Sequence, residues 1–340
     1  MQPSPSCGLL FAPPWVVEPL PILASMRIGV IGAGGVGGLY GALLARAGND
    51  VRFLARGAHL AAIRERGLEV RSAQLGTFRL QAPASDNARE LGQVELALFA
   101  VKTYDLRAAA EAARHLLGQS DSMLLTFQNG LDAPDQVAQI VGPEHVLIGT
   151  SALETYVAEP GLIVHASNFH TLTVSELNGP PTPRVERVHQ VLSQAGINVR
   201  VVEDGRRALW EKAWHLLPVA TLTSLCQSPL GPIKELPETA ALLETLLAEL
   251  VSIAGACGYD LPEATANAQR FIAAAGPGFT SSMARDFERG RPTELEALTG
   301  ALVRLADARG VEVPVTRTAY AVLKLRERQH RTLGSASAGG

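Results

Sequence analysis

Three glycines with the spacing G-x-G-x-x-G can form a cradle for the pyrophosphate of a dinucleotide, provided that a strand precedes them and a helix follows. Both neighbours are present, because a β-branched run ends at Ile31 and a helix-like segment covers residues 39–47. Gly32 is expected to make the tight turn, Gly34 to admit the phosphates, and Gly37 to let helix and strand pack closely. A glycine-rich turn without a ligand is the alternative. The predicted cofactor-binding residues of this turn and of the helix N-terminus are Gly32, Gly34, Gly35, Val36 and Gly37.

The end of the second predicted strand, residues 49–56, indicates which dinucleotide is bound. An Asp or Glu about 20 residues after the glycine motif would bind the ribose 2′-hydroxyl of NAD. This strand ends at Arg56 instead, and a guanidinium suits the 2′-phosphate of NADP through charge-assisted hydrogen bonds. The sequence therefore favours NADP over NAD, with a merely solvated arginine as the alternative.

Polar side chains also follow two later strands at the point where each strand ends. Lys102 comes directly after the apolar segment 94–101, and Asn129 follows the segment 122–127. Ligands of open parallel sheets bind at the carboxyl ends of the strands, so both residues are candidates for a cofactor or substrate site. The alternatives are an exposed lysine and a simple Asn-Gly turn.

Three further candidates lie in the second half of the chain. Lys212 is part of a helix-like segment, Ser282 stands in a Ser-Ser-Met run, and Glu294 follows Thr293. Their alternatives are a lysine lying along apolar surface, a serine that caps a helix, and an acid stabilised by a helix dipole. Residues 293–296 have the form of a capping box, which predicts that a helix begins there and ends at Gly310.

The elements that must position these residues fall into two groups. Strands and helices alternate over residues 26–203, which predicts an α/β domain of Rossmann type with a parallel sheet. Residues 204–333 read as helices only, so a cleft is expected between a dinucleotide domain and a helical domain. Residues 1–25, which carry six prolines, and the small-residue tail 334–340 are predicted to be disordered extensions.

Composition excludes several other classes of protein. A net charge of −3 and a pI near 6.3 give no basic surface for nucleic acid. Three cysteines without paired spacing indicate neither a disulfide framework nor a metal site, and a reducing cytoplasm fits them. We expect no membrane span, because Glu244 and Glu249 interrupt the most apolar helix. That helix, 239–257, can bury itself internally or against a partner, which leaves a homodimer open.

From Met26 to about Gln329 the chain resembles the ketopantoate reductase (2-dehydropantoate 2-reductase) family. The resemblance implies a Rossmann domain followed by a helical domain like the C-terminal domain of 6-phosphogluconate dehydrogenase. It also implies an enzyme of pantothenate biosynthesis that reduces ketopantoate, a small-molecule 2-oxo acid, with NADPH. The matching residues are Gly32-x-Gly34-x-x-Gly37, Arg56, Val101-Lys102, Asn129-Gly130, Pro160-Gly-x-x-x-His165, Leu209-Trp-x-Lys212, Ser281-Ser-Met283 and Thr293-Glu294.

The resemblance also implies a role for each polar candidate. Lys212 is implied as the general acid, Glu294 as a partner of a substrate hydroxyl, and Ser282 as a binder of the substrate carboxylate. Lys102 and Asn129 are placed on the cofactor and substrate side of the cleft.

The chemistry of these roles is coherent. Hydride transfer to a ketone develops negative charge on the oxygen, and an ammonium within about 3 Å can both stabilise that charge and donate a proton. We expect burial of Lys212 between Trp210 and Trp214 to lower the lysine pKa, and Glu294 to raise it.

One helix departs from the family pattern. The family usually has asparagines one and two turns after the catalytic lysine, whereas this chain has Leu216 and Ala220. His215 is displaced by one residue and so points about 100° away around the helix. This favours a related enzyme for a less polar 2-oxo or hydroxy acid, reducing it or oxidising it, over a distant orthologue. A non-catalytic NADP-binding sensor is disfavoured because Lys212 and Glu294 are both retained.

Overall fold

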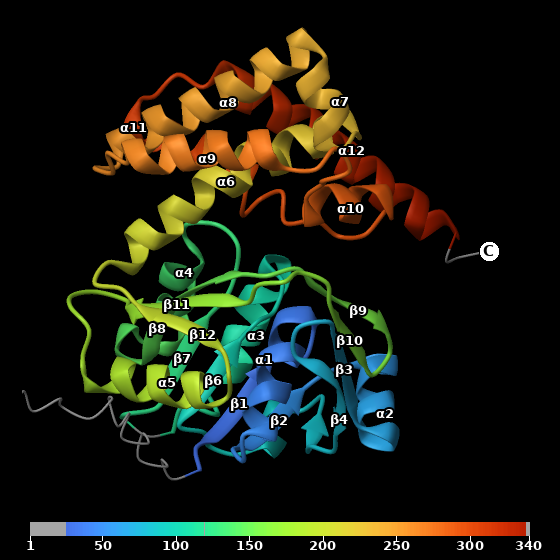
Figure 1. The fold of residues 1–340 in the computed structure, drawn as a ribbon, viewed down its shortest axis with the longest axis vertical. Helices are drawn as coiled ribbons and strands as arrows, with labels where there is room; N and C mark the ends of the chain where they lie inside the picture. The colour runs from blue at the N-terminus through green and yellow to red at the C-terminus, as the bar shows by residue number, and fades with distance from the viewer. Residues whose placement is uncertain (1–24, 119, 338–340) are drawn as a thin grey trace, which may run out of the picture.

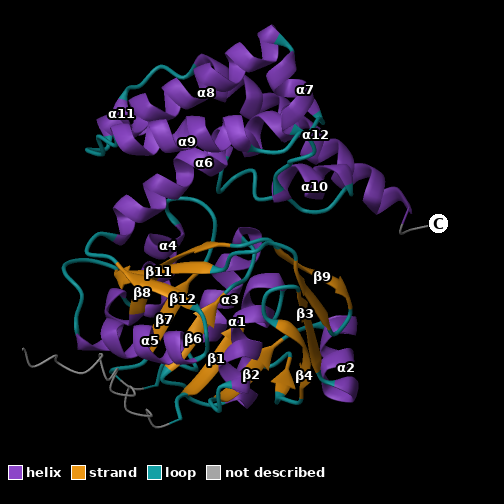
Figure 2. Cartoon of the chain, viewed as in Figure 1, coloured by secondary structure: helices purple, strands orange, loops and turns teal. Residues whose placement is uncertain are grey.

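The computed structural model describes residues 25–118 and 120–337 and shows a sheet-containing domain below a domain made of helices (Figure 1, Figure 2). The predicted disordered extension lies outside the described residues, apart from Ser25. The chain passes from the last strand of the lower domain into the first helix of the upper domain at Gly205.

Within the described residues, the large sheet has eight strands in the order β12-β11-β8-β7-β6-β1-β2-β5. All neighbouring pairs are parallel except β8 and β11, which are antiparallel. The predicted parallel sheet is confirmed, with this one antiparallel pair as an exception that the sequence did not indicate. The strands are β1 (Arg27–Ile31), β2 (Asp50–Leu54), β5 (Ala84–Ser85), β6 (Leu96–Phe99), β7 (Met123–Thr126), β8 (Val146–Ala152), β11 (Thr171–Glu176) and β12 (Asn198–Val201).

Helices cover both faces of this sheet, as in a doubly wound fold. Side chains of α1 and α5 pack on one face, and those of α3 and α4 pack on the other. The helices are α1 (Gly35–Arg46), α2 (Gly57–Arg66), α3 (Leu106–Ala113), α4 (Ala133–Val141) and α5 (Pro183–Gln194), with short 3₁₀ turns η1 (Ala88–Leu91), η2 (Thr103–Asp105) and η3 (Pro143–His145).

A second sheet, which the sequence did not predict, lies beside α1 and α2 (Figure 1). Its order is β4-β3-β10-β9, and Ile163 of β10 packs directly on Gly38 of α1. Four residues of β9 are exposed, so this strand lacks the alternating apolar pattern by which half-buried strands are recognised. The strands are β3 (Leu68–Ser72), β4 (Gly76–Leu80), β9 (Thr155–Glu159) and β10 (Leu162–His165).

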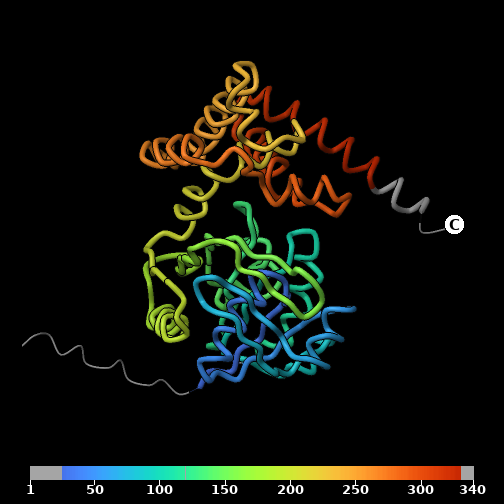
Figure 3. Tube along the Cα trace, turned by 45° about the vertical axis from the view of Figure 1, so that its right-hand side comes forward, coloured from blue at the N-terminus to red at the C-terminus, as the bar shows by residue number. Residues whose placement is uncertain are grey.

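The upper domain is built around α6, which rises out of the sheet domain into the other helices (Figure 3). The last helix, α12, is described as far as Ser337, and the predicted disordered tail from Gly334 stays a prediction. The helices are α6 (Gly205–Cys226), α7 (Leu230–Glu235), α8 (Pro237–Ala256), α9 (Pro262–Ala274), α10 (Ser282–Glu288), α11 (Thr299–Arg309) and α12 (Pro314–Ser337).

Helix α8 is long and apolar enough to cross a membrane by length and composition, yet it serves as a core helix of this domain. Four of its leucines, at positions 243, 246, 247 and 250, are buried, whereas Leu242 and Val251 are exposed. The buried Glu249 carboxylate accepts hydrogen bonds from the backbone N–H groups of Val315 and Thr316 at 2.9 and 2.7 Å. This carboxylate therefore caps the N-terminus of α12.

The capping box predicted at residues 293–296 does not form. The Thr293 hydroxyl donates to the Glu327 carboxylate at 2.6 Å, and the Glu296 carboxylate accepts from the Tyr320 hydroxyl instead of from the backbone of Thr293. Helix α11 begins only at Thr299 and ends, as predicted, at Gly310 in the left-handed conformation. Glu294 consequently lies in the turn that precedes this helix.

Candidate active site

The glycine motif forms the turn between β1 and α1. Gly32 has a φ of +97°, and a Cβ atom on Gly37 would lie 2.2 Å from the Gly32 carbonyl oxygen. Only glycine fits either position, because the first needs the left-handed region and the second a close contact of helix with turn. A Cβ on Gly34 would meet nothing within 4 Å, so open space faces the loop at the point predicted to admit phosphates.

The beginning of α1 suits an anion. Gly34 is the N-cap residue and provides no side-chain hydrogen bond, and the first turn, which includes Gly35 and the half-buried Val36, contains no acidic residue. The N–H groups of this turn and the positive end of the helix dipole are thus available to a pyrophosphate. These residues fit an NADP cofactor, which would be held along the Gly32–Gly37 loop.

Arg56 lies two residues after the end of β2 and is the N-cap of α2. Its side chain is 70% exposed, and its guanidinium forms an ion pair with the Asp105 carboxylate at 3.0 Å. Because no carboxylate ends the strand itself, the guanidinium is the charged group available to a 2′-phosphate at this edge of the sheet. Sequence reasoning missed Asp105, which neutralises part of the Arg56 charge.

Lys102 follows β6 and links the two domains. Its ammonium lies 2.8 Å from the Glu294 carboxylate and 3.5 Å from the Asp286 carboxylate. The backbone N–H of Thr103 also donates to Glu294, at 3.2 Å. Burial lowers the pKa of Lys102, but the charges of Glu294 and Asp286 outweigh that effect and hold the pKa above its ordinary value.

Asn129 follows β7 and is half-buried beside the turn that carries Glu294. The preceding residue, Gln128, fixes the loop, since its buried amide donates to the carbonyls of Phe99 and Val101 at 2.8 and 3.0 Å. Gly130 has a φ of +107°, and a Cβ there would lie 2.7 Å from the Ala297 carbonyl oxygen. The Asn129 loop therefore touches the helical domain three residues after Glu294.

Lys212 lies on α6, and its pKa is lowered to about 8 by burial, while the charge of Glu294 opposes that shift. We find no hydrogen bond or ion pair of its ammonium within the described residues. Trp210 and Trp214 do not enclose it, because both are buried in the core of the helical domain. Residues two positions away lie about 200° around a helix, so these side chains leave α6 on the opposite side. The expectation of burial between the tryptophans was wrong.

Ser282 begins α10 and is half-buried. The helix cap is supplied by its neighbour, because the Ser281 hydroxyl accepts from the Ala284 N–H at 3.0 Å. Asp286 lies one turn after Ser282, so the two share a face of α10, and Asp286 reaches Lys102. Sequence reasoning missed Asp286 as a member of the site, although its i, i+4 spacing from Ser282 indicates the shared face.

The residues that replace the expected asparagines differ in their surroundings. Leu216 is half-buried, and Ala220 is fully buried in the core cluster of the helical domain. The His215 ring donates to the Glu211 carbonyl at 2.9 Å and packs edge-on against Phe271 of α9. His215 therefore does not take the place of either asparagine.

The described part of the chain was also compared with the requirements of a metal site and of a disulfide. No group of three or more His, Cys, Asp or Glu side chains there could hold a metal ion. Cys226 and Cys257 are free thiols, and Cys7 lies outside the described residues.

A glycine turn that suits a pyrophosphate, on a domain whose Lys102 binds two carboxylates of a helical domain, is the arrangement expected of a dinucleotide-dependent oxidoreductase. Comparison with known protein families supports the same class of enzyme. The model of ketopantoate reductase PanE/ApbA matches residues 28–179, and the model of its C-terminal domain matches residues 204–327. The chain belongs to the ketopantoate reductase family, and as a member of it is an NADP-dependent oxidoreductase acting on CH–OH groups.

Individual relatives support this assignment. The chain is 34% identical to the 2-dehydropantoate 2-reductase of Halobacterium salinarum over 89% of this chain and 99% of that protein. It is 31% identical to the uncharacterized oxidoreductase YkpB of Bacillus subtilis, with the same coverage. The crystal structure of a PanE/ApbA family ketopantoate reductase from Ralstonia eutropha superposes with a TM-score of 0.83 at 30% identity, covering 90% of this chain and 100% of that one. A D-mandelate dehydrogenase with a TM-score of 0.82 at 20% identity shares the fold.

Proposed function

We propose that this chain reduces ketopantoate to pantoate with NADPH. The observation that carries the proposal is the placement of Lys212, whose pKa is lowered to about 8, near the Glu294 carboxylate that Lys102 holds at the carboxyl end of β6. This arrangement occurs in a chain that matches both domains of the ketopantoate reductase family.

Lys212 is the proposed proton donor. Bound in the glycine cradle, NADPH supplies the hydride that converts the ketone carbon into an alcohol carbon. The Lys212 ammonium stabilises the negative charge that develops on the substrate oxygen and donates the proton to it. A pKa of about 8 suits this task, because the amine is mostly protonated at neutral pH and still transfers its proton readily.

Glu294, Ser282 and the two groups on the sheet domain are proposed to position the substrate. Each Glu294 oxygen already accepts one hydrogen bond, from Lys102 or from the Thr103 N–H, and a carboxylate has further acceptor capacity for a substrate hydroxyl. The Ser282 hydroxyl is assigned to the substrate carboxylate, and the Asn129 amide to the side of the cleft that faces the cofactor.

Ion pairs hold the two domains together around this site. Lys102 binds Glu294, and Arg206 of α6 forms a two-fold hydrogen-bonded pair with Asp135 of α4 at 2.6 Å. Arg285 of α10 approaches Glu154 to 3.3 Å. The Arg206–Asp135 and Arg285–Glu154 pairs are partly exposed to water, so each contributes little to stability by itself, whereas Glu294 in the Lys102 pair is buried. Together the three pairs fix which surfaces of the two domains face each other.

The remaining parts of the proposal concern the kind of substrate, the cellular compartment and the oligomeric state. The substrate is a small molecule, and we assign the reaction to the cytoplasm, in keeping with the free thiols of Cys226 and Cys257. A homodimer stays a prediction, which sedimentation velocity of the purified protein tests.

A spectrophotometric screen of NADPH oxidation with a panel of 2-oxo acids tests the proposal. The panel contains ketopantoate, its analogue without the hydroxyl (3,3-dimethyl-2-oxobutanoate), and phenylglyoxylate. We expect the highest kcat/KM for ketopantoate and identification of pantoate by chiral chromatography. Higher kcat/KM for the two acids that lack the hydroxyl would assign the enzyme to less polar substrates, as expected if the half-buried Leu216 lines the pocket.

A further inference from the structure

One histidine of α2 joins the glycine loop to the second sheet. The Nε2 atom of His59 lies 2.8 Å from the Ala33 carbonyl oxygen, and the backbone N–H of Gly161 donates to His59 Nδ1 at 3.0 Å. A carbonyl oxygen only accepts and a backbone N–H only donates, so Nε2 carries the proton and Nδ1 does not. The imidazole is therefore neutral and makes one bond to the cofactor loop and one to the turn between β9 and β10.

We propose that His59 is a positioning residue for the cofactor, because it sets the orientation of the peptide group between Ala33 and Gly34. In a trans peptide the C=O and N–H bonds point in opposite directions. With the Ala33 carbonyl held by His59, the Gly34 N–H is directed to the other side, and a Cβ on Gly34 would meet only open space. This inference rests on the proposed use of NADPH.

The second sheet also contacts the peptide group between Gly35 and Val36. The Thr155 hydroxyl of β9 lies 3.3 Å from the Gly35 carbonyl oxygen and 3.0 Å from the Val164 carbonyl oxygen, so its single proton is shared between these two acceptors. A Cβ on Gly35 would lie 2.8 Å from the Thr155 carbonyl oxygen, so the strand is in direct contact with the loop. By the same reasoning, the Val36 N–H points away from β9.

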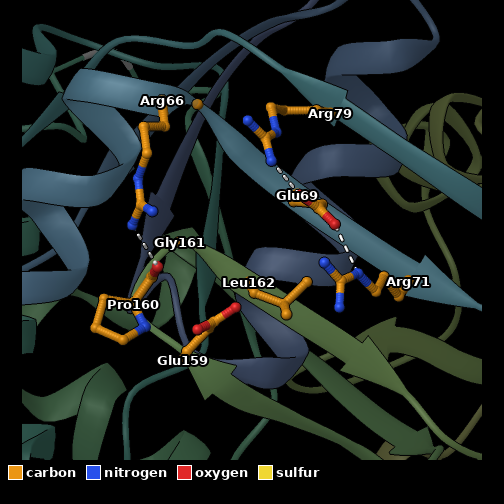
Figure 4. Close-up of a pocket in the computed structure, with 9 residues that line it drawn as sticks. Arg66, Glu69, Arg71, Arg79, Glu159, Pro160, Gly161 and Leu162 are labelled. Carbon is orange, nitrogen blue, oxygen red and sulfur yellow. Dashed lines mark hydrogen bonds and ion pairs between the residues drawn. The ribbon is translucent and has the colours of Figure 1, made fainter.

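The turn that supports His59 is itself anchored. Arg66, at the end of α2, donates to the Pro160 carbonyl at 3.3 Å, directly beside Gly161 (Figure 4). Gly161 has a φ of +84°, a conformation that favours glycine, and a Cβ there would lie 3.0 Å from the Ala62 Cβ. Two side chains of α2 thus fix this turn, and His59 transmits its position to the loop.

The chemistry of both bonds requires a neutral side chain with one acceptor and one donor. Burial lowers the pKa of His59, although the bond to Ala33 opposes this, so the neutral form is favoured. Glutamine can place an N–H donor near the position of Nε2, and asparagine can place an acceptor near that of Nδ1. Glutamine therefore keeps the bond to the Ala33 carbonyl, and asparagine keeps the bond to the Gly161 N–H. Comparing the two variants separates the contribution of each bond to NADPH binding.

The experiment measures NADPH dissociation constants by fluorescence titration of the full-length protein. We expect His59→Ala and His59→Asn to raise the Kd by roughly 10-fold, and His59→Gln to stay within about threefold of the wild type. The matched control is Arg64→Ala, which removes a 2.9 Å bond from the same helix to Ala84, away from the glycine loop. It is expected to leave the Kd unchanged. For His59→Asn, KM for NADPH should rise with kcat preserved at saturating NADPH.

Four results decide the outcome. Unchanged NADPH affinity in His59→Ala, with normal binding by the wild type, overturns the positioning role alone. Equal weakening in His59→Ala and Arg64→Ala also overturns it, because the effect would then come from general packing of α2. A wild type that does not bind NADPH overturns the proposed function as well. If His59→Ala does not fold, the comparison of the Gln and Asn variants decides, and equal Kd values for those two contradict the inference.

Discussion

Replacing Glu294 by glutamine should shift the pH dependence of reduction to lower pH. In the native protein, burial lowers the pKa of Lys212 to about 8 although the Glu294 charge raises it. An opposite charge in such a site raises a lysine pKa by about 1–3. Taking the low end of that range, we expect the pKa of Lys212 to fall from about 8 to roughly 7 in Glu294→Gln.

The expected effect on rate follows from the protonated fraction of Lys212. For an acid catalyst, kcat is constant below its pKa and falls about tenfold for each pH unit above it. At pH 8, roughly half of the wild-type lysine but only about a tenth of the variant lysine would be protonated, so kcat should drop about fivefold from protonation alone. At pH 6 Lys212 should be mostly protonated in both proteins. Any remaining difference in kcat there would come from the loss of the Glu294 contact with the substrate, which does not depend on pH.

The assay is NADPH oxidation at saturating substrate between about pH 6 and pH 10, with enzyme stability checked at each value. Asp286→Asn is the matched control, because it also removes a carboxylate beside Lys102, while only Glu294 contributes a charge effect to the pKa of Lys212. A wild-type profile without a break in this range would refute the assignment of Lys212 as the acid. A break in Glu294→Gln that stays in place or moves upward would refute the electrostatic link.

Three further substitutions test other parts of the account. Arg56→Ala should weaken NADPH binding roughly 10–100-fold and leave NADH binding nearly unchanged, as measured by paired fluorescence titrations; equal losses for both cofactors would contradict the role in 2′-phosphate recognition. Tyr40→Phe should stabilise the fold by about 1 kcal/mol, because the buried Tyr40 hydroxyl packs beside Phe127 without a hydrogen-bond partner among the described residues. Urea denaturation measures this change, and a less stable variant would show that the hydroxyl is satisfied. Gly37→Ala should abolish NADPH binding, since its Cβ would lie 2.2 Å from the Gly32 carbonyl oxygen. Calorimetric titration measures this binding, and native affinity in the variant would contradict the close contact of α1 with the glycine turn.

The sequence could predict those site residues whose position follows from the strand or helix next to them in the chain. The strand, glycines and helix around Gly34 are consecutive, so their relation is fixed within one turn of chain. Lys102 and Asn129 each lie three residues after a buried strand, and adjacent parallel strands present their carboxyl ends at one edge of a sheet.

Relations between distant segments could not be predicted in this way. Lys102 and Glu294 pair across 192 positions of sequence, and His59 and Gly161 across 102, so no local pattern marks either contact. The strand β11 is buried along most of its length, and its residues do not encode whether it runs with or against β8. The error about Trp210 and Trp214 was avoidable, because helical geometry already places them on the side of α6 opposite to Lys212.

The most direct test of the central claim is the kinetic comparison of the wild type with Lys212→Ala, using ketopantoate and NADPH at neutral pH. We predict that the wild type forms pantoate, and that Lys212→Ala lowers kcat by on the order of 10²–10⁴ while NADPH binds with nearly unchanged affinity. Full activity in Lys212→Ala, or no reduction of ketopantoate by a wild type that binds NADPH, would contradict the account.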